Sequence, residues 1–102
     1  MTLPSRFWAD LPWPAFRSLP ADTVAILPIA SIEQHGPHLP VSVDTTINEG
    51  VVARVLAKLP AECPVLVLPT QQVGCSVEHL RYPGTLTSTP ETLLAFWSDI
   101  GR

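Results

Sequence analysis

Two short apolar segments, each followed by a polar loop and a stretch with helical spacing, constrain the fold of this chain most. Residues 23–30 are largely apolar and rich in β-branched side chains, and residues 64–69 repeat that character. Both segments are too short for a buried helix, so each predicts a strand covered on both faces. Strand, loop and helix, repeated in this order, indicate a parallel sheet with covering helices. We therefore expect an α/β fold.

Both expected helices have recognisable first residues. Asp44 is expected to cap the first helix, which Pro60 ends. Thr89 is expected to cap the second helix, with Pro90 at its first position. Apolar residues recur at steps of three and four in the first helix, which predicts one apolar face. That face comprises Ile47, Val51, Val52, Val55, Leu56 and Leu59.

The 102 residues suit one small domain or part of a larger one. Residues 1–21 carry aromatic side chains among prolines and predict a lead-in segment with a short helix at 13–18. Its rings are expected to pack on a neighbouring surface; the alternative is that the Trp residues line a pocket or an interface. Residues 22–102 then hold the α/β part. Because two strands do not make a stable parallel sheet, we expect a truncated domain that exposes apolar surface and self-associates.

Charge and composition exclude several classes of partner. The net charge is −3, and the six Lys and Arg residues are scattered, so neither a nucleic acid nor an anionic membrane surface is expected as a partner. No apolar window is long enough for a transmembrane helix, and the N-terminus has no pattern of a secretory signal. We therefore expect a cytoplasmic protein in which Cys63 and Cys75 are reduced thiols.

Candidate metal ligands lie in and just after the loop that leaves the first expected strand. Glu33 and His35 are two residues apart, so in extended backbone their side chains point the same way. Asp44 follows at the helix start, where its two oxygens can bridge a pair of ions. Ligands of open α/β sheets bind beyond the carboxyl ends of the strands, and mixed histidine and carboxylate ligands suit Zn²⁺ or Mn²⁺. On spacing alone, a polar hydrogen-bonded loop without metal is the alternative.

Four more polar residues are candidates for a supporting role. His38 is expected to orient a ligand or to be structural, rather than to bind a metal itself. Ser76, Glu78 and His79 follow the second expected strand, so we expect them beside the first loop. There they either bind substrate and move protons or hold the loop through hydrogen bonds.

Two longer motifs resemble the signatures of the creatininase family. The first, Leu-Pro-Ile-Ala-Ser-Ile-Glu-Gln-His-Gly-Pro-His-Leu-Pro at residues 27–40, is followed by Val-Asp-Thr at 43–45. The second, Glu-His-Leu-Arg-Tyr-Pro-Gly-Thr at 78–85, is similar to Glu-His-x-x-Phe-x-Gly-Thr, with Tyr82 in place of Phe. Two long motifs in this order, each after an expected strand, are specific.

The resemblance implies the N-terminal part of a three-layer α/β/α domain with a mainly parallel sheet, in a family that is often hexameric. It implies two divalent metal ions, Zn²⁺, Mn²⁺ or Fe²⁺, with Glu33 on one ion, His35 on the other, and Asp44 bridging both. The implied reaction is hydrolysis of a C–N bond in a small or cyclic amide by a metal-activated water.

The family's remaining metal ligands belong to an Asn-Gly-His motif and a later Glu-containing segment, which these 102 residues do not include. We therefore expect weak or no metal binding by this chain alone, and a non-catalytic truncated fragment is the alternative to an enzyme. The short segment 76–79 resembles uncharacterised members of the family and its mycofactocin peptidase more than its creatinine amidohydrolase.

Overall fold

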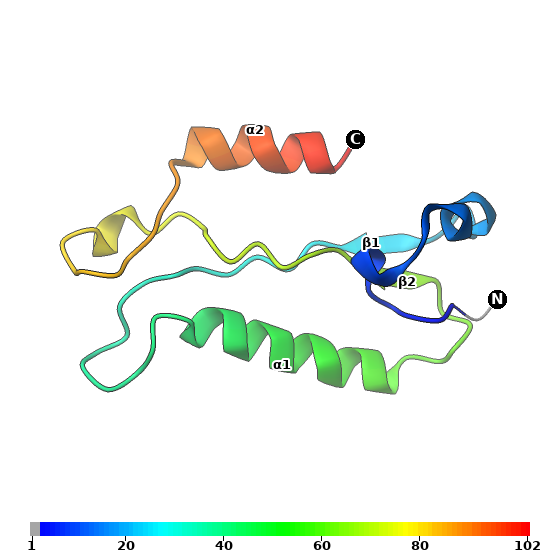
Figure 1. Cartoon of the computed structure of the whole chain (residues 1–102), viewed down its shortest axis with the longest axis horizontal. Helices are drawn as coiled ribbons and strands as arrows, with labels where there is room; N and C mark the ends of the chain where they lie inside the picture. Colours follow the sequence, from blue (N-terminus) through cyan, green and yellow to red (C-terminus); the bar gives the residue numbers. More distant parts are fainter. Residues whose placement is uncertain (1–2) are drawn as a thin grey trace.

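The computed structural model describes residues 3–102 and confirms the expected alternation of strands and helices. Helices α1 and α2 lie on opposite sides of a pair of strands, which gives the layered α/β arrangement seen in Figure 1. The elements are η1 (Trp8–Asp10), η2 (Trp13–Ser18), β1 (Val24–Ile26), α1 (Val43–Lys58), β2 (Val65–Val67), η3 (Val77–His79) and α2 (Pro90–Ile100), where η denotes a 3₁₀ helix.

Strands β1 and β2 pair in parallel, with Ala25 opposite Leu66. Each strand is shorter than the apolar segment that predicts it. The Leu68 N–H still donates to the Ile26 carbonyl, but Pro28 lacks the N–H that the next hydrogen bond of the ladder requires. The pairing resumes beyond these prolines as a single parallel bridge between Ile29 and Gln71. Because the strands are parallel, the loops that follow them both leave the sheet at the carboxyl ends of the strands.

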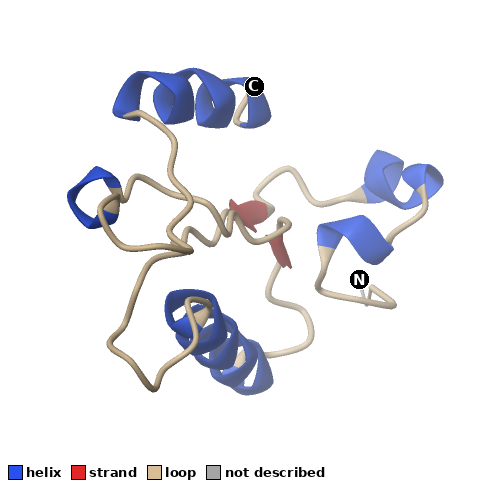
Figure 2. Cartoon of the chain, turned by 60° about the vertical axis from the view of Figure 1, so that its left-hand side comes forward, coloured by secondary structure: helices blue, strands red, loops and turns tan. Residues whose placement is uncertain are grey.

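The expectation that both strands are covered on both faces is correct for β2 and wrong for β1. Leu66 is fully buried, whereas Val24 is 55% exposed. The lead-in segment pairs with β2 and not with β1: Phe7 forms a parallel bridge with Val67, whose N–H donates a hydrogen bond of 2.7 Å to the carbonyl of Arg6. The lead-in thus lies along the outer edge of β2, and Figure 2 shows helical turns of the N-terminal part beside the strand pair.

The lead-in is held by polar and aromatic contacts. The guanidinium of Arg6 donates hydrogen bonds to the carbonyls of Pro60, Cys63 and Val65, just before and at the start of β2. The short helix expected at 13–18 is present as η2, and η1 precedes it. The rings of Trp8 and Phe16, one from each turn, pack with their centroids 4.6 Å apart.

Trp13 departs from the expectation that the lead-in rings pack on a neighbouring surface. Its side chain is 67% exposed and is covered on one face only, where the guanidinium of Arg17 lies 4.5 Å from the ring centroid. A cation–π contact at such an exposed position contributes about 0.5–1 kcal/mol, much less than burial of the ring would.

The expected N-cap of α1 is wrong. The helix begins at Val43, and Ser42 stands at the N-cap position without a side-chain capping hydrogen bond, so Asp44 lies within the first turn instead of before it. Its side chain accepts a hydrogen bond from the hydroxyl of Ser31 at 2.5 Å. The sequence pattern predicts that the Asp44 carboxylate caps the helix, but this carboxylate makes a tertiary contact with Ser31 instead.

The single apolar face expected for α1 is divided into two stripes. Val52, Leu56 and Leu59 are half-buried, whereas a second stripe is exposed. The exposed stripe comprises Ile47 (60% exposed), Val51 (57%) and Val55 (44%). Apolar packing therefore uses only part of the face that the spacing of three and four predicts.

Helix α2 begins as expected. The hydroxyl of Thr89 accepts a hydrogen bond from the N–H of Thr92 at 3.2 Å, and Pro90 is the first helical residue. Leu93 is buried while its neighbour Leu94 is 71% exposed. The radius of gyration of 16.1 Å exceeds the value of about 13 Å typical of a compact domain of this length, so the layers are more spread than in a closed domain.

Glycine is required where the loops after the two strands approach each other. A Cβ atom at Gly74 would lie 2.5 Å from the backbone oxygen of Ala30, well inside van der Waals contact. No such neighbour surrounds Gly50 in the middle of α1.

We predict opposite effects of alanine at these two glycines. Gly74→Ala should lower the free energy of unfolding by about 1–3 kcal/mol, because it pushes the two loops apart. Gly50→Ala should raise it by about 0.5–1 kcal/mol, because alanine is the better helix former. Urea unfolding followed by circular dichroism measures both changes. A Gly74→Ala variant as stable as the parent would contradict the close approach of the loops.

Candidate metal site

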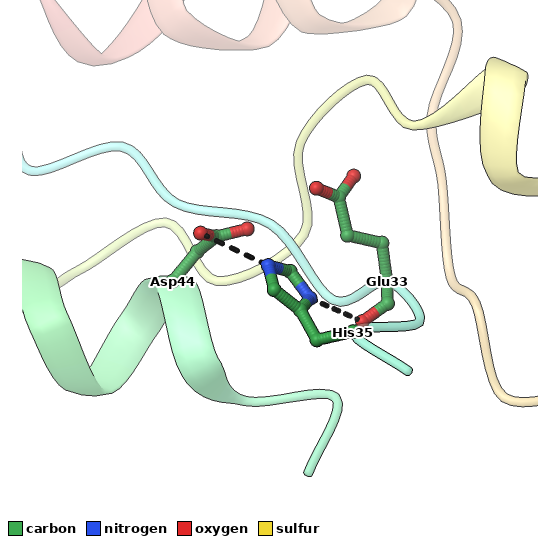
Figure 3. A group of neighbouring side chains, drawn as sticks. All are labelled: Glu33, His35 and Asp44. Atoms are coloured by element: carbon green, nitrogen blue, oxygen red, sulfur yellow. Dashed lines mark hydrogen bonds and ion pairs between the residues drawn. The ribbon is translucent and has the colours of Figure 1, made fainter. Parts of the chain in front are cut away.

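The structure brings Glu33, His35 and Asp44 together at the edge of the sheet where β1 ends. Glu33 and His35 come from the loop after β1, and Asp44 comes from the first turn of α1 (Figure 3). One ligand atom from each residue lies within 4.8 Å of the others. This grouping is suited to one divalent ion or to two neighbouring ions.

Hydrogen bonding fixes the orientation of the His35 ring. Its Nδ1 lies 3.0 Å from the backbone carbonyl of Glu33, and a carbonyl oxygen only accepts, so Nδ1 carries the proton. In the neutral ring, the lone pair of Nε2 is therefore free, and it faces Asp44 Oδ1 at 3.5 Å. A histidine ligand whose other ring N–H is bound by a carbonyl is the arrangement that metal sites use.

The contact between His35 and Asp44 fits a bound cation. Neutral Nε2 and an ionised carboxylate are both acceptors, so they attract each other only when the ring is protonated or a cation lies between them. Two ligand atoms at about 2.1 Å from a tetrahedral ion are about 3.4 Å apart. The observed 3.5 Å matches that separation.

Two hydrogen bonds fix the helix that carries Asp44. Ser31 occupies Oδ2 of Asp44, which leaves Oδ1 for His35. One turn further along α1, the amide of Asn48 donates a hydrogen bond of 2.8 Å to the carbonyl of Ile29. Both contacts join the same side of α1 to the chain just after β1, so the carboxylate is held at a defined distance from the loop.

The second loop lies beside the first, as expected. His79 Nε2 is 3.8 Å from Glu33 Oε2 and 3.8 Å from Glu78 Oε1, so these three residues form a second group next to the first. The ring also contacts the side chain of Gln34, whose Nε2 is 3.2 Å from His79 Nδ1. Glu33 is therefore shared by the two groups.

His38 and Ser76 lie apart from these contacts. His38 is exposed, and neither ligand group in residues 3–102 includes it. Ser76 is fully buried, and its hydroxyl has no hydrogen-bond partner, while its backbone N–H donates to the Thr87 hydroxyl at 2.7 Å. A supporting role for either residue stays a prediction.

Sequence reasoning did not single out Gln34 or Ser31. Both stand inside the first motif, and both hold a candidate site residue by a side-chain hydrogen bond. The only available signal is their type, since an amide and a hydroxyl beside candidate ligands are the groups that usually orient them.

The pKa of the His35 imidazole is raised above its ordinary value of 6.5. The main cause is the hydrogen bond that it donates to the Glu33 carbonyl, and the negative charges of Asp44 and Glu33 add to it, whereas burial acts in the opposite direction. Protonation at Nε2 competes with a metal for the same lone pair. Metal affinity should therefore fall as the pH drops through this raised pKa.

We predict a defined pH dependence for the metal-free chain. A raised folded-state pKa adds stability that is fully present below pH 6.5 and is lost as the pH rises through the raised value. Titration by ¹H–¹⁵N NMR should give His35 a pKa above 6.5, which Asp44→Asn lowers and which Glu49→Gln on the exposed side of α1 leaves in place. A His35 pKa at or below 6.5 in the parent would show that the ring does not make these contacts.

Comparison with known proteins identifies the family of this chain. The family model described as "Creatininase: Creatinine amidohydrolase" matches residues 9–102. This chain belongs to the creatininase family.

Its relatives include the mycofactocin precursor peptide peptidase of Mycobacterium tuberculosis, which is 40% identical over 83 residues, covering 76% of this chain and 33% of that protein. The creatinine amidohydrolase of Pseudomonas putida is 31% identical over 105 residues, covering 96% of this chain and 39% of that protein. The chain thus spans about a third of the length of the curated relatives.

Solved structures of creatininases have the same fold. A manganese form superposes with a TM-score of 0.80 at 30% identity, covering 94% of this chain and 38% of that one. A Zn–Zn form of a mutant creatininase gives a TM-score of 0.80 at 30% identity, over 96% of this chain and 39% of that one. The expected creatininase-like α/β architecture is confirmed, and divalent metals occur in the family.

None of the helices between residues 3 and 102 combines the length and apolar character needed to cross a membrane.

Proposed function

We propose that this chain carries the N-terminal metal-binding loops of a divalent-metal amidohydrolase that hydrolyses a C–N bond in a small or cyclic amide. The observation that supports this most directly is the lone pair of His35 Nε2 facing Asp44 Oδ1 at 3.5 Å, with Glu33 beside them. The family match over residues 9–102 adds the reaction class.

The ligand set suits a pair of divalent ions, Zn²⁺, Mn²⁺ or Fe²⁺. Glu33 would hold one ion and His35 the other, and Asp44 would be shared between them. Two carboxylates around one neutral imidazole supply the negative charge that a dication needs. When bound, such ions lower the pKa of water and polarise a carbonyl oxygen.

Residues of this chain orient the candidate metal ligands and place charge around them. Ser31 holds one oxygen of Asp44, and the Glu33 carbonyl holds the His35 ring, so both groups are oriented before any metal arrives. Glu78 and His79 form the neighbouring wall, where the exposed Glu78 carboxylate can accept a hydrogen bond from a polar substrate. A small amide and further copies of the chain, in a homo-oligomer, are the partners that the family membership supports.

The relatives indicate which class of amide substrate to test first. The mycofactocin precursor peptide peptidases are more similar to this chain than the creatinine amidohydrolase is, at 40% and 31% identity. The short segment 76–79 agrees with the former. A peptide-like amide is therefore the first substrate class to test, with creatinine as the comparison.

We predict that metal binding depends on Asp44. Metal analysis by mass spectrometry after dialysis against Zn²⁺ or Mn²⁺ should show roughly tenfold or greater loss of affinity in Asp44→Asn, because an isosteric amide removes the bridging charge. The double variant Glu33→Ala, His35→Ala should lose binding altogether.

The matched control is Glu49→Gln, which removes an exposed carboxylate from the same helix and should bind metal like the parent. Metal bound by the parent and bound equally by Asp44→Asn would sink the proposed site. Metal-dependent hydrolysis of short peptides by the parent alone would support the enzyme. Metal binding without hydrolysis of any amide would support the alternative, a non-catalytic fragment.

A further inference from the structure

We propose that Gln34 is a positioning residue that holds His79 in a single ring tautomer, with the proton on Nε2 and directed at the Glu33 carboxylate. This inference rests on the function proposed above, in which Glu33 is a metal ligand. It gives a role to a side chain that stands between two ligands and that no motif assigns.

The direction of the Gln34 amide follows from its first hydrogen bond. The backbone N–H of Gly36 donates to Gln34 Oε1 at 3.0 Å, and an N–H requires an oxygen as its partner. The amide nitrogen is thereby turned to the other side, where it lies 3.2 Å from His79 Nδ1. An amide NH₂ only donates, so His79 Nδ1 must accept, and the neutral ring carries its proton on Nε2.

Two carboxylates lie near this N–H of His79. His79 Nε2 lies 3.8 Å from Glu33 Oε2 and equally far from Glu78 Oε1. The Glu33 side chain is only 16% exposed and the Glu78 side chain 63%, so water screens the Glu78 contact more strongly. The stronger electrostatic partner of the ring is therefore Glu33: hydrogen bonds run from Gly36 to Gln34 and from Gln34 to His79, and the Glu33 carboxylate lies 3.8 Å from His79 Nε2.

The two histidines consequently have opposite tautomers. His35 donates from Nδ1 to a carbonyl and presents the lone pair of Nε2, whereas His79 accepts at Nδ1 and presents a proton at Nε2. A metal needs a lone pair. The group of Glu33, Glu78 and His79 has the residue types of a metal site, but His79 presents a proton to it, so a cation fits the group of Glu33, His35 and Asp44 better.

Histidine tautomers can be read directly by NMR in the metal-free chain, which has only three histidines. In protein labelled with ¹⁵N-histidine, at a pH where the rings are neutral, two-bond N–H correlations show which ring nitrogen is protonated. His38→Asn and His79→Asn variants assign the signals. We expect Nε2–H for His79 and Nδ1–H for His35, and a parent His79 protonated at Nδ1 would overturn the inference.

Substitution of Gln34 is the sharper test. Gln34→Glu replaces the donating NH₂ by an accepting oxygen of the same size, so the His79 Nδ1 signal should move from the unprotonated to the protonated type. Gln72→Glu, which adds the same charge at an exposed position of the second loop, should leave the tautomer unchanged. An unprotonated Nδ1 in Gln34→Glu would refute the role of Gln34.

A third variant covers the case in which Gln34→Glu does not fold, which circular dichroism would detect. Gln34→Met keeps the length of the side chain but removes the donor, so His79 should then show a mixture of tautomers. A single Nε2–H tautomer in Gln34→Met would also overturn the inference. None of these NMR measurements involves metal or activity. If Asp44→Asn failed to reduce metal binding, the proposed function would be rejected, but the tautomer of His79 would be unaffected by that result.

Discussion

The candidate site depends on the parallel pairing of β1 with β2. This pairing sets Ala25 opposite Leu66 and continues as the bridge between Ile29 and Gln71, so both chains leave the strands at the same edge. The missing side chain of Gly74 then lets the second loop approach the backbone of the first. Glu33 and His79, far apart in the sequence, meet only because these backbone contacts hold their loops side by side.

Polar contacts attach the first half of α1 to this frame. The hydrogen bonds of Asp44 to Ser31 and of Asn48 to Ile29 lie on one side of the helix, while Ile47 and Val51 are exposed. Each such bond contributes about 1 kcal/mol net, and apolar burial adds little at this end of the helix. The position of the helix thus depends partly on a candidate ligand, which couples the geometry of the site to its own charge.

Much of this arrangement follows from residue spacing. The order of strands and helices, and the meeting of Glu33 with His35 and of the two loops, follow from short apolar segments and from the common edge at which parallel strands end. The position of Asp44 does not follow, because Ser42 and Asp44 both suit a cap and only the tertiary contact with Ser31 decides between them. Nor does the pairing of Phe7 with Val67, since a proline-rich segment carries no strand pattern.

The loop between His35 and Asp44 gives a bound metal a second effect. A cation shared by these two residues would cross-link loop and helix and close the backbone of residues 36–43 into a ring. Pro37 and Pro40 stiffen that segment, and Gly36, with φ at +80°, makes its first turn, so little conformational entropy is left to lose on closure. Loss of the metal would then appear first as local opening of this ring, while the strand pair stays intact.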